Sequence, residues 1–256
     1  MSKLSVENRF LDLSDYGRPV AKRIAKSLRN TSITPIHVTI SFGISGLIAM
    51  ACMLTNHYWA AGVFLIIKSI LDAADGELSR VKNTPSYTGR YLDSIFDIIL
   101  NALLLITIAY ISNNSWLYTF LAFICIQLQG TLYNYYYVII RNKYDGGDTT
   151  SRIIENKAPT AMAGESQSTV NVLFFLFTLF YAFFDKTILK FDENAVKVRY
   201  FPNWFMSLIS LYGLGFQLLI MSVMLAFNLI NCIIPFFILY SFLLIVFIGI
   251  RRCFVN

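Results

Sequence analysis

The chain has 256 residues, of which 56% are hydrophobic and only 14% are charged. Soluble domains carry about 45–50% apolar and about 25% charged residues, so this composition excludes a soluble globular enzyme and a disordered tail. Lys and Arg total 21 against 15 acidic residues, which gives a net charge of +6. In so apolar a chain, this excess favours anionic lipids or phosphates as partners over nucleic acid. We therefore expect an integral membrane protein.

Residues 1–33 are expected to form a cytoplasmic segment before the membrane domain. Within Gly17–Asn30 an apolar stripe is surrounded by basic residues: Val20, Ile24 and Leu28 against Arg18, Lys22, Lys26 and Arg29. This pattern is typical of an amphipathic helix that lies in the headgroup layer of a membrane. The alternative is that the helix forms one wall of a cytoplasmic active-site cavity.

Residues 34–256 are expected to form the transmembrane domain. A helix needs roughly 17–25 mostly apolar residues to cross a bilayer. Seven segments qualify: Ile36–Leu54, Tyr58–Ala74, Tyr91–Ile111, Trp116–Ile140, Val170–Phe184, Phe205–Ile230 and Cys232–Ile250. The fifth is short, and the last two are separated only around Asn231. The predicted fold is an all-α, polytopic transmembrane helix bundle with six or seven spans.

The basic residues predict the orientation of this bundle. They gather before the first span and in the loops Arg80–Arg90 and Arg141–Lys157, whereas the short connections Thr55–His57 and Ser112–Ser115 carry none. The positive-inside rule then places the N-terminus and both basic loops in the cytoplasm. The segment Asp185–Trp204 would lie outside, although it contains four basic residues. With seven spans Arg251 and Arg252 would also end outside, which favours an even number of spans or an irregular C-terminal pair.

Four aspartates mark the ends of the second and third predicted spans. Asp72 and Asp75 are three residues apart and Asp93 and Asp97 four apart, so each pair shares one face of a helix. Two antiparallel helices joined by the loop Val81–Thr88 would bring both pairs together. Ionisable residues within spans are costly and by default functional. Four close carboxylates need cations, and oxygen ligands suit Mg²⁺ or Mn²⁺, with room for two ions.

The neighbouring residues suit phosphate chemistry. Gly76 lets a ligand approach the backbone, and Arg80 offers a fixed fork of hydrogen-bond donors. Gly89 lies one turn before Asp93 and leaves room on the same helix face. Cations and an arginine would neutralise a diphosphate, and a spare carboxylate would accept a proton from a hydroxyl nucleophile.

This spacing resembles the signature of the CDP-alcohol phosphotransferase family, D-x2-D-G-x2-A-R-x8-G-x3-D-x3-D. The matching residues are Asp72, Asp75, Gly76, Arg80, Gly89, Asp93 and Asp97. Ser79 replaces the alanine of the signature and is small enough to keep close packing. A weaker similarity is Thr34-Pro35-Ile36-His37, where the family often has T-P-N-x. Ile36 replaces that asparagine, and His37 is a candidate to supply its contact.

The resemblance implies a membrane enzyme of phospholipid synthesis that uses two Mg²⁺ or Mn²⁺ ions. Asp72, Asp75 and Asp93 would bind metal, and Asp97 would share a metal and act as general base on the acceptor hydroxyl. CMP would leave as that hydroxyl attacks the β-phosphorus. The residues expected to contact CDP or its diphosphate are Asp75, Gly76, Ser79, Arg80, Gly89, Thr34 and Pro35. A homodimer is also implied.

Two donor schemes remain open within the family. CDP-diacylglycerol could give a phosphatidyl group to a small polar alcohol or its phosphate, or a soluble CDP-alcohol (CDP-choline, CDP-ethanolamine or CDP-inositol) could give its headgroup to a lipid hydroxyl. Arg141 and Arg152 are candidates to bind the acceptor. Lys68, one turn before Asp72, is a candidate to bind a phosphate of the donor or the acceptor, or to serve as a counter-ion of the aspartates. The rival class is a cation transporter with intramembrane carboxylates, which would not need arginine and glycines at fixed offsets.

Overall fold

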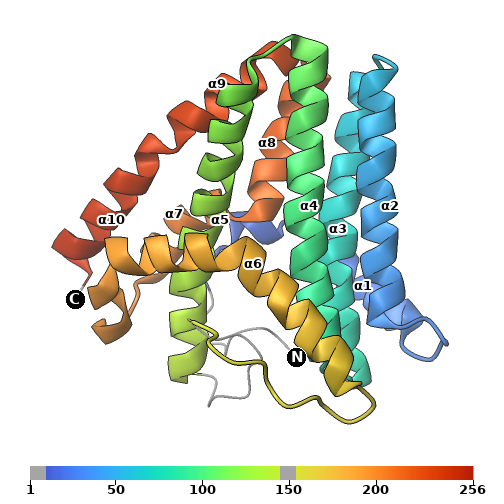
Figure 1. Cartoon of the computed structure of the whole chain (residues 1–256), viewed down its shortest axis with the longest axis vertical. Helices are drawn as coiled ribbons and strands as arrows, with labels where there is room; N and C mark the ends of the chain where they lie inside the picture. The colour runs from blue at the N-terminus through green and yellow to red at the C-terminus, as the bar shows by residue number, and fades with distance from the viewer. Residues whose placement is uncertain (1–9, 145–153, 256) are drawn as a thin grey trace.

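The computed structural model describes residues 10–144 and 154–255, which contain helices and no strands. A short helix, α1 (Arg18–Leu28), precedes four long ones. They are α2 (Pro35–Leu54), α3 (Tyr58–Lys82), α4 (Tyr87–Ser112) and α5 (Trp116–Tyr144). These four helices alternate in direction, and the connection from α3 to α4 is short (Figure 1). The acidic ends of α3 and α4 are therefore held at one end of the bundle.

The remaining helices are shorter or bent. They are α6 (Gln167–Phe191), η3 (Glu193–Lys197), α7 (Asn203–Ile209), η4 (Ser210–Tyr212), α8 (Leu214–Ala226), α9 (Ile230–Tyr240) and α10 (Phe242–Phe254). The chain bends by 52° between η4 and α8. The helix α6 runs obliquely across the long helices, whereas α8 rises along them and α9 and α10 descend (Figure 1).

Five of the described helices are long and apolar enough to cross a membrane, and the bent pair of α7–η4 with α8 makes a sixth. These five are α2, α4, α5, α6 and the continuous stretch Ile230–Phe254. The helix α3 is not among them, because Lys68, Asp72 and Asp75 interrupt its apolar sequence. The all-α membrane bundle is thus confirmed, with six as the upper count for the described residues.

The course of α6 differs from the expected one. Glu165, just before α6, accepts a hydrogen bond from the Thr88 amide at the start of α4 (2.6 Å). Asp192, just after α6, accepts one from the hydroxyl of Tyr136 on α5 (2.8 Å), and Lys143 donates to the Val198 carbonyl. The segment after α6 therefore lies against the C-terminal half of α5, beside a loop that was predicted to be cytoplasmic. These contacts and the oblique course of α6 conflict with the expectation that Asp185–Trp204 lies outside, and the side of the membrane on which this segment lies stays a prediction.

The segment before α1 packs into the bundle. The amide of Leu13 donates to the Ser210 hydroxyl (2.9 Å), and the hydroxyl of Tyr133 donates to the Asp12 carboxylate (2.6 Å). Ser14 approaches the backbone of Gly213 and Gly215 so closely that a Cβ at either glycine would overlap it. These glycines therefore permit the contact that joins the N-terminal segment to the start of α8.

The predicted helix before the first span is present as α1, and Ile24 and Leu28 of the predicted apolar stripe are partly buried against α3. Ala21 and Ala25 are fully buried beside Ala74 and Leu78 of α3, whereas Val20 of the predicted apolar stripe is 44% exposed. Alanines let two helices approach closely, which explains why this face packs against α3. The location of α1 in the headgroup layer stays a prediction.

Candidate active site

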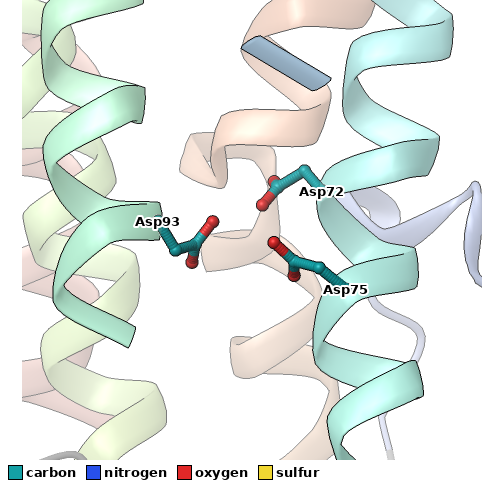
Figure 2. Close-up of side chains that lie close together, drawn as sticks. All are labelled: Asp72, Asp75 and Asp93. Carbon is teal, nitrogen blue, oxygen red and sulfur yellow. The ribbon is translucent and has the colours of Figure 1, made fainter. Parts of the chain in front are cut away.

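Three aspartates from two helices point toward one another (Figure 2). Asp72 and Asp75 project from α3 and Asp93 from α4, and one carboxylate oxygen of each lies within 4.8 Å of the others. The sharp turn between these helices sets this register. Asn83 ends α3 in the left-handed conformation, and the Ser86 hydroxyl caps α4 by accepting a hydrogen bond from the Gly89 amide (2.9 Å).

The donor set of this cluster suits a hard divalent cation. The Asp75 Oδ2 atom accepts a hydrogen bond from the Thr39 hydroxyl (2.7 Å), which fixes that carboxylate. The Asp93 Oδ1 atom is buried and has no hydrogen-bond partner. A buried carboxylate oxygen without a partner is costly unless a cation binds it. The residues therefore fit a Mg²⁺ or Mn²⁺ ion.

Asp97 has a different partner. Its Oδ1 atom lies 2.7 Å from the Nζ atom of Lys68, which is only 1% exposed and lies 4.9 Å from the centre of the Phe42 ring. Of the two roles predicted for Lys68, this contact favours that of a counter-ion. Asp97 nevertheless reaches the same cavity as Asp72 and Asp93.

Arg80 folds back over Gly76, whose missing Cβ would lie 3.6 Å from the guanidinium. The Nη2 atom lies 2.9 Å from Glu77 Oε1, and the Nε atom is buried without a hydrogen-bond partner. Glu77 is 2% exposed and also accepts a hydrogen bond from Arg18 (2.8 Å). Glu77 was not predicted as a site residue, because the signature leaves its position variable. Its spacing three residues before Arg80 was the available signal.

Ser79 and Gly89 lie at helix ends. The hydroxyl of Ser79 donates to the Thr84 carbonyl (2.9 Å) and so helps to end α3. Gly89 is held by the Ser86 cap in the first turn of α4. Both residues therefore stabilise the turn between the acidic segments, and their predicted contacts with CDP stay predictions.

Thr34, Pro35 and His37 form the start of α2. Thr34 is the N-cap, Pro35 follows it, and the His37 ring takes part in a capping box in which Nδ1 accepts from the Thr34 amide (3.0 Å). The connection before α2 is also held by Lys82, which donates to the carbonyl oxygens of Thr31 and Ile33 (2.7 and 2.6 Å). The predicted nucleotide contacts of Thr34 and Pro35 remain predictions.

A cavity of about 380 Å³ opens beside the acidic cluster, between α3, α4, α5, α6 and α8. Its lining includes Asp72, Asp93 and Asp97 and the predicted acceptor residue Arg141. The other polar lining residues are Arg90, Ser94, Asn101, Gln127, Thr131, Tyr133, Asn134, Tyr135, Tyr137, Glu155, Tyr181, Asp185 and Gln217. Lys68 is not part of this lining, and Arg152 lies outside the described residues. The cavity offers the kind of polar surface that a hydroxylated acceptor needs.

Sequence reasoning also missed two glutamates in the connection from α5 to α6. Glu155 pairs with Arg90 and accepts a hydrogen bond from the Tyr91 hydroxyl (2.5 Å) in the wall of the cavity. Glu165 accepts hydrogen bonds from the first turn of α4. Partial burial by itself raises the pKa of Glu165, but the hydrogen bonds from Thr88 and Ser86 outweigh it and lower the pKa to about 2. Neither glutamate lies in a periodic segment or a motif, so no sequence signal identified them.

Comparison with known proteins finds a family and two relatives of this chain. Archaetidylinositol phosphate synthase of Pyrococcus horikoshii is 35% identical over 103 residues, which are 40% of this chain and 55% of that protein. Bifunctional IPC transferase and DIPP synthase of Thermococcus kodakarensis is 30% identical over 109 residues, 43% of this chain and 25% of that protein. The matched region thus spans about half of the first relative and a quarter of the second. A family model described as CDP-alcohol phosphatidyltransferase matches residues 33–254, and the chain belongs to this family of membrane enzymes.

Proposed function

We propose that this enzyme transfers a phosphatidyl-type group from a CDP-linked lipid to a small polar alcohol or its phosphate and releases CMP. The observation that carries the proposal is the convergence of Asp72, Asp75 and Asp93 beside a polar cavity that also contains Asp97. The name of the Pyrococcus relative describes the synthesis of a lipid with an inositol phosphate headgroup. That name favours a CDP-lipid donor over a soluble CDP-alcohol.

The three converging aspartates would hold a divalent ion. Bound there, a Mg²⁺ or Mn²⁺ ion supplies positive charge that neutralises the donor diphosphate. On the donor side, the unpartnered Nε of Arg80 is placed to bind an anionic oxygen. Gly76 leaves the backbone accessible beside it, and the donor extends past Ser79, Gly89, Thr34 and Pro35.

On the acceptor side, Asp97 accepts the proton of the attacking hydroxyl. Lys68 holds one oxygen of Asp97 and so orients the other toward the cavity. Arg141 binds the acceptor within the cavity, and Arg152 belongs to the same basic connection. From the positive-inside rule we place the site at the cytoplasmic face, and we propose a homodimer from the family resemblance.

The test is a CMP-release assay with the purified protein in detergent and Mg²⁺. CDP-diacylglycerol with a panel of alcohols and alcohol phosphates should release CMP, and CDP-choline, CDP-ethanolamine and CDP-inositol with lipid acceptors should not. Asp93→Asn should abolish release, whereas Glu193→Gln, at an exposed acid of η3, should not. Headgroup transfer from a soluble CDP-alcohol, with no release from CDP-diacylglycerol, would reverse the assignment of the donor.

A further inference from the structure

Lys68 of α3 is buried and contacts residues of both α2 and α4. The side chain is 2% exposed, its stem passes Gly46, whose missing Cβ would lie 3.7 Å from Cδ, and its ammonium lies over Phe42. A buried ammonium is costly unless it is paired. The partner is Asp97, whose Oδ1 atom lies 2.7 Å from Nζ and whose side chain is 15% exposed. The pair therefore lies inside the bundle.

This pairing separates Asp97 from the other three aspartates. Within the described residues, the carboxylates that converge to within 4.8 Å are Asp72, Asp75 and Asp93, and Asp97 is outside that group. Three carboxylates can share one divalent ion, while the fourth already has a cation next to it. The cation next to Asp97 is therefore the Lys68 ammonium, which belongs to the chain itself.

We propose that the Lys68 ammonium takes the place of a second divalent ion at Asp97, so that the site holds one divalent ion per chain. The inference rests on the proposed function only in assigning a divalent ion to the cluster of three aspartates. It departs from the expectation of two ions.

Like-charge repulsion is the physical reason. A divalent ion bound to Asp97 would lie about 2.1 Å from a carboxylate oxygen. The ammonium lies 2.7 Å from Oδ1, so the two cations would be within about 5 Å of each other if they shared that oxygen. The interior screens such a repulsion much less than water does. An arrangement with one divalent ion and one ammonium avoids it and leaves the second oxygen of Asp97 for the acceptor hydroxyl.

The experiment counts bound Mn²⁺ by titration calorimetry and by electron paramagnetic resonance on the purified protein in detergent without nucleotide. The wild type should bind one Mn²⁺ per chain. Lys68→Met and Lys68→Gln should each bind two and show the spin coupling of neighbouring Mn²⁺ ions. Lys68→Gln keeps a hydrogen-bond donor for Asp97 and serves if the methionine variant does not fold.

Two further variants serve as controls for the number of bound Mn²⁺ ions. The double variant Lys68→Met/Asp97→Asn removes both charges and should return to one Mn²⁺. Lys190→Met, which removes an exposed lysine of α6, should also bind one. Two Mn²⁺ ions in the wild type, none in the wild type, or one in both single variants would each overturn the proposal. The count requires no donor or acceptor, so an inactive enzyme in the CMP assay would defeat the proposed function and leave this result standing.

Discussion

Replacing Glu165 by alanine should lower the free energy of unfolding by about 2 kcal/mol at pH 7. The carboxylate accepts hydrogen bonds from the Ser86 hydroxyl (2.7 Å), the Thr88 amide (2.6 Å) and the Met162 amide (3.0 Å). Its pKa is about 2, against an ordinary value of 4.5. That difference corresponds to about 3–4 kcal/mol before solvent screening is considered. Because the carboxylate is only partly buried, solvent screening reduces the contribution to about 2 kcal/mol.

The same pKa predicts the pH dependence of this effect. Because the folded-state pKa of Glu165 lies below the unfolded one, its contribution is complete above about pH 4.5 and is lost as the pH falls toward 2. At pH 3 less than half should remain. The assay is thermal unfolding of wild type and Glu165→Ala in detergent at pH 7 and pH 3, with Glu193→Ala as the control at an exposed acid. An equal loss of stability at both pH values, or no loss at pH 7, would refute the reasoning.

Three further predictions concern the site and the fold. Asp97→Asn should reduce CMP release about 1,000-fold and keep Mn²⁺ binding, which calorimetry can measure; release above a tenth of the wild-type rate would exclude Asp97 as the base. Arg80→Ala should raise the KM for the CDP-lipid about 10- to 100-fold and leave that for the alcohol within about twofold; equal effects on both would contradict its place on the donor side. Arg251→Met leaves Asp192 buried without its guanidinium and should cost about 3–5 kcal/mol, which thermal unfolding measures. Adding Asp192→Asn should restore part of that loss, and no restoration would argue against the ion pair.

The acidic cluster was predictable because its geometry is local. Spacings of three and four residues place side chains on one helix face, and a short connection forces α3 and α4 to be antiparallel neighbours. The partner of Asp97 was less predictable. Lys68 lies one turn before Asp72, so periodicity alone allows it to meet a ligand or a carboxylate. Only the packing of α2, through Phe42 and Gly46, determines which of the two it meets.

The direction of α6 was not predictable from hydropathy. A stretch such as Val170–Phe184 is apolar enough to span a membrane, and apolarity says nothing about tilt. The four basic residues within Asp185–Trp204 conflicted with an outside location from the start. The roles of Glu155 and Glu165 depend on contacts with α4 about 65 and 77 residues away in sequence. Contacts between residues so far apart produce no periodic pattern in the sequence.

The ion pair between Asp192 and Arg251 has a consequence for the order of assembly. The two residues are 59 positions apart in the sequence. During synthesis Asp192 therefore lacks the guanidinium of Arg251 until α10 has been made. Until then a carboxylate that ends up almost fully enclosed has to stay hydrated, which disfavours early docking of the chain after α6. The wall that α6 contributes to the cavity should therefore be the last part of the enzyme to mature, and a nascent chain that stalls before α10 should have formed the acidic cluster while the chamber beside it is still open.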